Sequence, residues 1–316
     1  MTIEKKNRGS ILLFVILISF HTSISAAILP APQKISDHSY AWIGPLDGPS
    51  IENNGYRMNL GFVIGKKYVL VVDTGYTPEM AKEMIGHIRK ITKLPIKYAV
   101  NTNSQAHRFY GNAEFKKIGA SLLTHPDELT RMDKLNGIYS TIIENVLQRK
   151  KDSVALAVLP EKLITTQKDF DLGGLKVVVK TLGAAHTPSS LIVFIPQDKI
   201  IFTGDILYGN RLLAVVEDSN VSEWIKSYKK LKQFKGYTMI PGHGQPGPLS
   251  NFDFSTLSYL ELLHKHMTAQ VEQDAGANAA IKSLDQSAYS NLTNFDLLAG
   301  KNASWAYLQA ESAAFD

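Results

Sequence analysis

Five short segments of the chain carry residue types that bind metal ions or transfer protons. Residues 101–108 read Asn-Thr-Asn-Ser-Gln-Ala-His-Arg. Imidazole changes charge near neutral pH, and both imidazole and carboxylate are common zinc ligands. These residue types therefore allow acid–base catalysis or metal-assisted hydrolysis. The other four segments are Val71-Val72-Asp73-Thr74-Gly75, Ala185-His186-Thr187-Pro188, Phe202-Thr203-Gly204-Asp205 and Pro241-Gly242-His243-Gly244.

In this order and at these spacings, the segments resemble those of the metallo-β-lactamase fold hydrolases, from about Tyr56 to Gly244. The resemblance implies an α+β fold, an αββα sandwich of two mixed β-sheets flanked by helices. It also implies metal ligands on loops at strand ends, because a rigid sheet can hold side chains that reach a common point. These hydrolases usually bind two metals through a His-x-His-x-Asp-His motif and three later ligands.

The motif itself is rewritten in this chain. When the flanking residues are registered without a gap, Asn103 and Gln105 replace two histidines. His107 replaces the aspartate, and Arg108 replaces the last histidine, as an arginine does in one lactamase subclass. The three later ligand positions are matched one for one by His186, Asp205 and His243.

Because the motif is rewritten, we expect this chain to bind one metal ion where members of the family that it resembles usually bind two. His107, Asp205 and His243 offer two imidazoles and a carboxylate, which suit catalytic zinc and also ferrous iron. At the other metal position His186 is the single strong ligand left, because amide oxygens bind zinc poorly. A bound zinc ion lowers the pKa of its water to about 7 and so supplies hydroxide for hydrolysis.

Supporting roles follow from the same resemblance. His186 can take or relay a proton, and Asn103 and Gln105 can donate hydrogen bonds to a developing oxyanion. Asp73 and Arg108 are not expected to bind the metal themselves. They are expected to hold the ligand loops in place through hydrogen bonds.

A metal-free alternative stays open, because all four motif positions are changed. In this alternative the protein is catalytically silent and binds a ligand or a protein partner, and Arg108 pairs with Asp205 in place of a cation. A third alternative is true β-lactamase activity. An exported protein suits that activity, but the changed ligands and the absence of cysteine disfavour it.

The expected partner is a small-molecule substrate of unknown identity. Tyr208, Asn210 and Arg211 follow Asp205 and are candidates to contact a polar or anionic substrate, although exposed loop residues are the commoner explanation. The net charge of +5 is mild and its lysines are scattered, so no nucleic-acid partner is expected.

Alternating strand-like and helix-like runs predict the frame that positions these residues. We expect one domain over residues 28–316, with a helical tail that resembles that of exported glyoxalase II-like, quinoprotein-associated members. The expected strands cover residues 58–64, 68–72, 96–100, 121–124, 163–166, 175–181, 191–195, 199–203 and 238–240, and the expected helices cover 77–91, 111–118, 126–150, 221–231, 260–271 and 302–311.

Residues 1–27 are expected to form a signal peptide. Lys5, Lys6 and Arg8 precede an apolar run over residues 11–20, which is too short to span a bilayer. The mature protein is therefore expected in the periplasm or outside the cell, without a stable membrane span. The chain has no cysteine, so its stability must come from its core rather than from disulfides.

Overall fold

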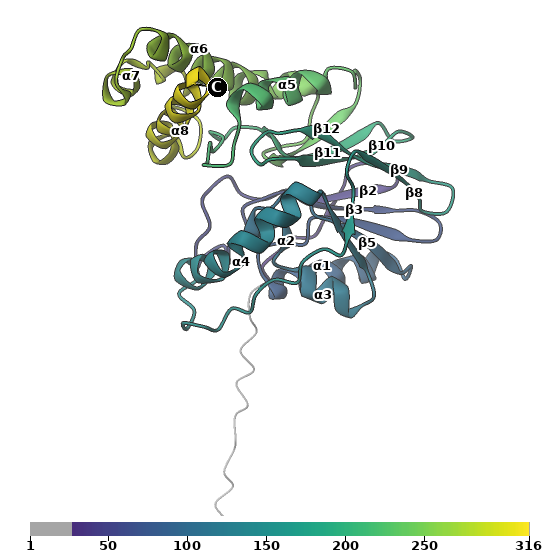
Figure 1. Ribbon diagram of the computed structural model, residues 1–316. Coiled ribbons are helices and arrows are strands. Elements are labelled where there is room, and N and C mark those ends of the chain that lie inside the picture. Colours follow the sequence, from purple (N-terminus) through teal and green to yellow (C-terminus); the bar gives the residue numbers. More distant parts are fainter. Residues whose placement is uncertain (1–26, 316) are drawn as a thin grey trace, which may run out of the picture.

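The computed structural model describes residues 27–315 and stacks two β-sheets face to face, with helices on both outer sides (Figure 1). This is the αββα sandwich that the sequence predicts. The expected signal peptide lies outside the described residues, apart from its last position. In the part of the chain that is described, no helix is both long enough and apolar enough to cross a membrane.

The first sheet is mixed, because β1 to β4 pair antiparallel and β4 to β7 pair parallel. Its strands, in spatial order, are β1 (Gln33–Lys34), β2 (Ser39–Trp42), β3 (Leu60–Ile64), β4 (Val69–Val72), β5 (Ile96–Val100), β6 (Ser121–Thr124) and β7 (Lys162–Leu163). The helices on its side are α1 (Pro78–Ile91), α2 (Ala106–Phe109), α3 (Asn112–Lys117) and α4 (Pro126–Val146).

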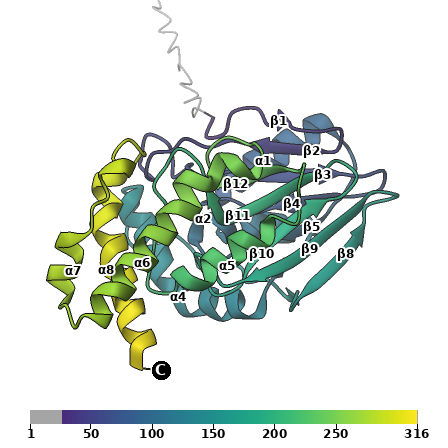
Figure 2. The ribbon, with the colours of Figure 1, turned by 90° about the horizontal axis from the view of Figure 1, so that it is seen from above.

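The second sheet is also mixed, since β12 pairs parallel with β11 while the remaining pairs are antiparallel. In spatial order it contains β12 (Thr238–His243), β11 (Ile200–Tyr208), β10 (Ser190–Ile195), β9 (Lys176–Gly183) and β8 (Gln167–Asp171). Its helices, seen from above in Figure 2, are α5 (Val221–Leu231), α6 (Tyr259–Glu272), α7 (Ala277–Ser283) and α8 (Phe295–Phe315). Short 3-10 and π-helical turns are η1 (Leu249–Phe252), η2 (Asp253–Ser258) and η3 (Ser287–Tyr289).

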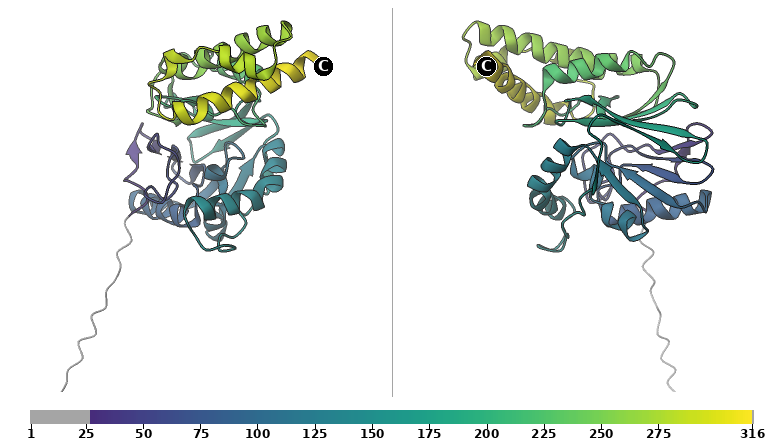
Figure 3. Two further views of the ribbon diagram at one scale, coloured as in Figure 1. Left: turned by 90° about the vertical axis from the view of Figure 1, so that its left-hand side faces the viewer. Right: turned by 45° about the vertical axis from the view of Figure 1, so that its right-hand side comes forward.

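Three buried hydrophobic clusters hold these layers together, and the side views of Figure 3 show the layers that they join. One cluster fills the space between the two sheets and includes Val72 and Phe202. A second joins the first sheet to its helices, with Met84 of α1 fully buried. A third joins the second sheet to α5, α6 and α8 around Trp224. Burial of apolar surface is the main favourable term in folding, so these clusters set the sandwich.

The strand expected over residues 163–166 is shorter and begins earlier, as the two-residue β7, and the sequence predicts no strand over β8. The chain leaves the first sheet after β7 and enters the second sheet at β8. β8 reads Gln-Lys-Asp-Phe-Asp with only Phe170 buried, so it gives no strong apolar alternation to detect. The helix expected over 126–150 ends at Val146, just before Gln148 turns into the left-handed region at φ 48°. Asp205 and His243 lie inside strands that run further than predicted.

Replacing Met84 by Ala should destabilise the fold by roughly 2–5 kcal/mol, because it leaves a cavity under α1. The matched change Ile91→Ala, on the same helix but 41% exposed, should alter the free energy of unfolding by less than about 0.5 kcal/mol. Urea unfolding of both variants measures the difference. Equal losses of stability would show that this face of α1 does not pack as described.

Candidate metal centre

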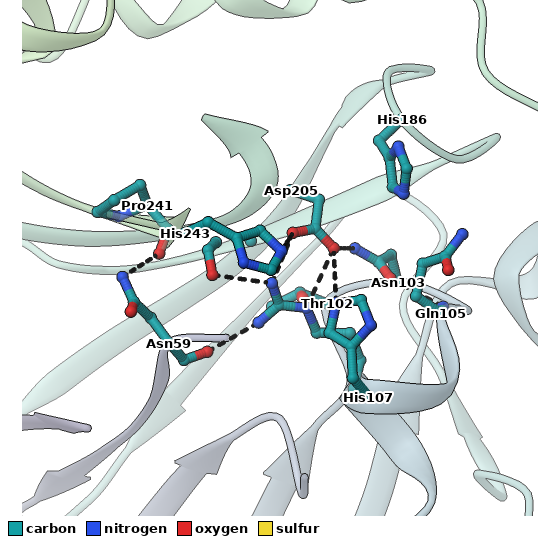
Figure 4. A network of polar contacts seen from close by, with 12 residues as sticks. Asn59, Thr102, Asn103, Gln105, His107, His186, Asp205, Pro241 and His243 are labelled. Carbon is teal, nitrogen blue, oxygen red and sulfur yellow. Dashed lines mark hydrogen bonds and ion pairs between the residues drawn. The ribbon is translucent and has the colours of Figure 1, made fainter. Parts of the chain in front are cut away.

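Three side chains of ligand type converge between the sheets. His107 lies in α2 after β5, Asp205 lies in β11, and His243 is the last residue of β12. One ligand atom of each lies within 4.8 Å of the other two, and each residue is at most 2% exposed (Figure 4). The fold therefore brings together three residues that are far apart in the sequence.

The donor set fits a metal ion. His107 Nε2 lies 3.4 Å from Asp205 Oδ2, and His243 Nε2 lies 3.3 Å from Asp205 Oδ1. Each imidazole therefore faces a different oxygen of the carboxylate, and two imidazoles with one carboxylate are a donor set that suits catalytic zinc. Within residues 27–315, the buried Nε2 of His107 has no hydrogen-bond partner, and a metal ion would satisfy it.

Both imidazoles are neutral at pH 7, as metal ligands must be. Nδ1 of His243 donates to the backbone oxygen of Arg57 at 2.7 Å, which leaves the lone pair on Nε2 facing Asp205. Burial lowers the pKa of His243 to about 3. Burial, together with the charge of Arg108, holds the pKa of His107 well below its usual range.

Arg108 lies at the centre of the site and is fully buried. Its Nη2 and Nε donate to the two oxygens of Asp205 at 2.6 and 3.1 Å, and its Nη1 donates to Asp73 at 3.0 Å. Burial by itself would raise the pKa of Asp205, but the charge of Arg108 lowers it well below the usual range. The contact expected in the metal-free alternative is therefore present, and Asp205 is a carboxylate.

Gly242 makes room for this ion pair. A Cβ atom at this position would lie 2.3 Å from Asp205 Oδ1 and 2.8 Å from Arg108 Nη2. The backbone oxygen of Gly242 also accepts a hydrogen bond from Arg108 at 3.2 Å. Any larger side chain would force the pair apart, so the glycine before His243 is a requirement of the site.

The remaining motif residues surround the ion pair. Oδ1 of Asp73 accepts from the backbone N–H of Thr102 at 2.7 Å and so holds the loop after β5. Asn103 Nδ2 donates to Asp205 Oδ2 at 2.8 Å, which commits one of its two N–H groups to the carboxylate rather than to a substrate. Gln105 is half-buried at the start of α2, and its side chain makes no hydrogen bond within the described residues.

His186 is grouped with the metal ligands on sequence, but in the structure it lies outside the three-residue group (Figure 4). Its Nδ1 donates to the backbone oxygen of Ala214 at 2.8 Å. Its ring packs 5.6 Å from Trp224 and 6.1 Å from Tyr208, measured between centroids. Burial lowers the pKa of His186 to about 4, so its imidazole is neutral at pH 7.

Two arginines complete the surroundings. Arg57, which sequence reasoning missed because no motif marks it, places Nη2 3.4 Å from His107 Nδ1. Arg211 places Nη1 3.5 Å from His243 Nδ1 and is only 4% exposed. The sequence left open that Asn210 and Arg211 are ordinary exposed loop residues. This is true of Asn210, which is exposed, and not of Arg211, which is buried.

Comparisons of the sequence and of the fold with known proteins all lead to one group of proteins. A family model described as the metallo-beta-lactamase superfamily matches residues 56–243. The metallo-beta-lactamase type 2 of Bacillus cereus is 24% identical over 210 residues, covering 65% of this chain and 72% of that protein. A linear primary-alkylsulfatase of Pseudomonas sp. is 22% identical over 210 residues, covering 56% of this chain and 40% of the sulfatase. A solved metallo-beta-lactamase from Pontibacter korlensis shares the fold, with a TM-score of 0.57, 22% identity, and coverage of 73% of this chain and 98% of that one.

Replacing Arg108 by Gln should destabilise the protein by roughly 3–5 kcal/mol, because two buried carboxylates lose their cation. The control Arg149→Gln removes an arginine whose pair with Glu79, at 3.1 Å, lies on the surface, and it should cost less than about 1 kcal/mol. Chemical denaturation measures both. If the two variants were equally stable, Asp73 and Asp205 could not depend on Arg108 for compensation.

Stability should fall as the pH drops from 7 to 5. The folded pKa of His186, about 4, lies below its unfolded value, so the unfolded chain takes up the proton first. This residue should contribute about 2 kcal/mol of the loss. Urea unfolding of chelator-treated protein at both pH values measures it. His186→Asn should reduce the loss by that amount, while the exposed-residue control His264→Asn should not; an unchanged slope in His186→Asn would contradict the assignment.

Proposed function

The chain belongs to the metallo-β-lactamase superfamily, and from that premise we propose that it is an exported hydrolase that works with a single metal ion. Membership fits a metal-dependent hydrolase that acts on a small-molecule substrate. The number of metals, the preference for zinc over iron and the export are the finer parts of the proposal.

One observation carries the proposal. His107, Asp205 and His243 come from three separate elements and still present ligand atoms within 4.8 Å of one another, with the Nε2 of His107 unsatisfied. These residues would hold the metal. Zinc bound there would lower the pKa of water to about 7 and supply the nucleophile for hydrolysis.

The other residues of the site orient these ligands and handle the proton. The hydrogen bond from His243 Nδ1 to the Arg57 backbone fixes the tautomer that leaves Nε2 as a ligand. Arg108 fixes the orientation of the Asp205 carboxylate through two hydrogen bonds. His186, neutral at pH 7 and bonded only through Nδ1, keeps an Nε2 lone pair that can accept a proton.

Export rests on the N-terminal sequence. Basic residues, an apolar run over residues 11–20 and small residues near position 27 follow the order of a signal peptide. The mature protein is accordingly proposed to be periplasmic or secreted.

A second candidate function is metal-free ligand binding, and the Arg108–Asp205 contact favours it. The guanidinium already neutralises Asp205 from inside the site, as a metal cation would. In this candidate His107 and His243 bind a ligand through hydrogen bonds instead of holding a metal.

Metal content separates the two candidates. Protein purified without a histidine tag should contain about one zinc or iron per chain, as a single catalytic site requires. The variant His107→Ala should lose this metal, because it removes an unsatisfied ligand nitrogen. Elemental analysis gives the stoichiometry, and the exposed-residue variant His264→Ala is the matched control, expected to retain the metal.

The protein with its metal bound is expected to be an active hydrolase. Zinc-supplemented wild type should hydrolyse at least one ester, thioester, sulfate ester or β-lactam in a panel that includes nitrocefin, since relatives are named as β-lactamases and an alkylsulfatase. The same activity should be lost in His107→Ala and kept in His264→Ala. Wild type that stays metal-free after zinc is offered would support the metal-free candidate instead.

A further inference from the structure

Two guanidinium groups lie beside the imidazoles of His107 and His243, one next to each ring. Arg57 approaches His107, and Arg211 approaches His243, each at 3.4–3.5 Å from Nδ1. Arg211 is almost fully buried, and Arg57 is half-buried as a whole residue. Neither arginine has a part in the metal ligand set or in the Arg108 ion pair.

The Nε atom of both arginines lacks an acceptor. The Nε atom of each is buried, and within residues 27–315 it has no hydrogen-bond partner. Neither forms an ion pair with a described carboxylate, whereas Arg108 takes both Asp73 and Asp205.

Within the described residues, the one polar atom at hydrogen-bond distance from the Arg211 side chain is a donor and not an acceptor. His243 Nδ1 lies 2.7 Å from the backbone oxygen of Arg57, and a carbonyl oxygen can only accept, so this nitrogen must carry its proton. It therefore has no lone pair to accept a hydrogen bond from Arg211 Nη1. A buried donor left in this state costs about 1–3 kcal/mol, and more when it is charged.

The local charge is unbalanced. Arg57, Arg108 and Arg211 carry three positive charges. The carboxylates of Asp73 and Asp205 are both bound to Arg108, and Asp47, which lies near Arg211, forms no ion pair with it. A buried excess of positive charge is stable only when an anion compensates it.

We propose that Arg57 and Arg211 bind an oxyanion, a carboxylate, sulfate or phosphate group, beside His107 and His243. The planar fork of a guanidinium matches such groups with paired hydrogen bonds, and the unsatisfied Nε atoms supply donors for them. The ligand of this protein is therefore an anionic small molecule whose charged group lies against the imidazole pair. The anion site needs no metal and exists in either candidate function.

Binding of inorganic phosphate to chelator-treated protein tests this site without any dependence on metal or on hydrolysis. Isothermal titration at constant ionic strength should show saturable binding of about one phosphate per chain, as a single arginine pair provides. Arg57→Gln and Arg211→Gln should each weaken binding at least about tenfold, since each removes charged hydrogen bonds. Sulfate and acetate in the same assay identify which oxyanion fits best.

Two controls separate a binding role from a structural one. Arg149→Gln changes an arginine on the surface and should bind phosphate as wild type does. In anion-free buffer Arg211→Gln should unfold at the wild-type temperature or above it, because it loses an uncompensated charge, and phosphate should raise the unfolding temperature of wild type alone. The proposal is overturned if none of the three anions binds saturably, if both variants bind as well as wild type, or if Arg211→Gln is less stable without anion.

Discussion

The buried contact of Arg108 with Asp73 and Asp205 is the interaction on which the site depends. Asp73 directly follows β4 of the first sheet, and Asp205 lies in β11 of the second, so one side chain joins both sheets. Removing ions from water costs several kcal/mol each and is offset only by complete hydrogen bonding. Arg108 reaches that state by also donating to the backbone of Asn59 and of Gly242. The backbone around the site is built to fit one guanidinium.

The same contact governs what can bind. A carboxylate has about four lone-pair positions, and Arg108 with Asn103 fills three of those of Asp205. A metal held by His107, Asp205 and His243 therefore shares its carboxylate with a permanent cation. Arg57 and Arg211 add positive charge that opposes a metal ion and attracts an anion. An oxyanion bound by Arg57 and Arg211 would reduce this repulsion, so metal and anion binding should favour each other at this site.

Much of the frame was predictable because it follows from local patterns. Apolar runs between turn residues identify most of the strands, and Pro78 after the capping Thr77 sets the start of α1. The errors in the strands share one cause. β8 is a polar edge strand, and β11 and β12 continue through Gly204-Asp205 and Pro241-Gly242-His243, where pairing with a neighbour and not propensity holds the strand.

The sequence by itself determined the family, the sandwich, and the positions of His107, Asp205 and His243, because ordered segments at fixed spacings are visible along one chain. Only the tertiary structure separated His186 from these ligands and revealed that the buried Nε atoms of Arg57 and Arg211 have no acceptor within the described residues. The burial of the site residues, the tautomers of the histidines and the ion pairs of the arginines depend on contacts between residues that are far apart in the sequence. Arg57 and His243, for example, lie 186 positions apart. Spacing along the chain carries no information about such contacts, so the charge balance of the site appears only when the sheets are packed.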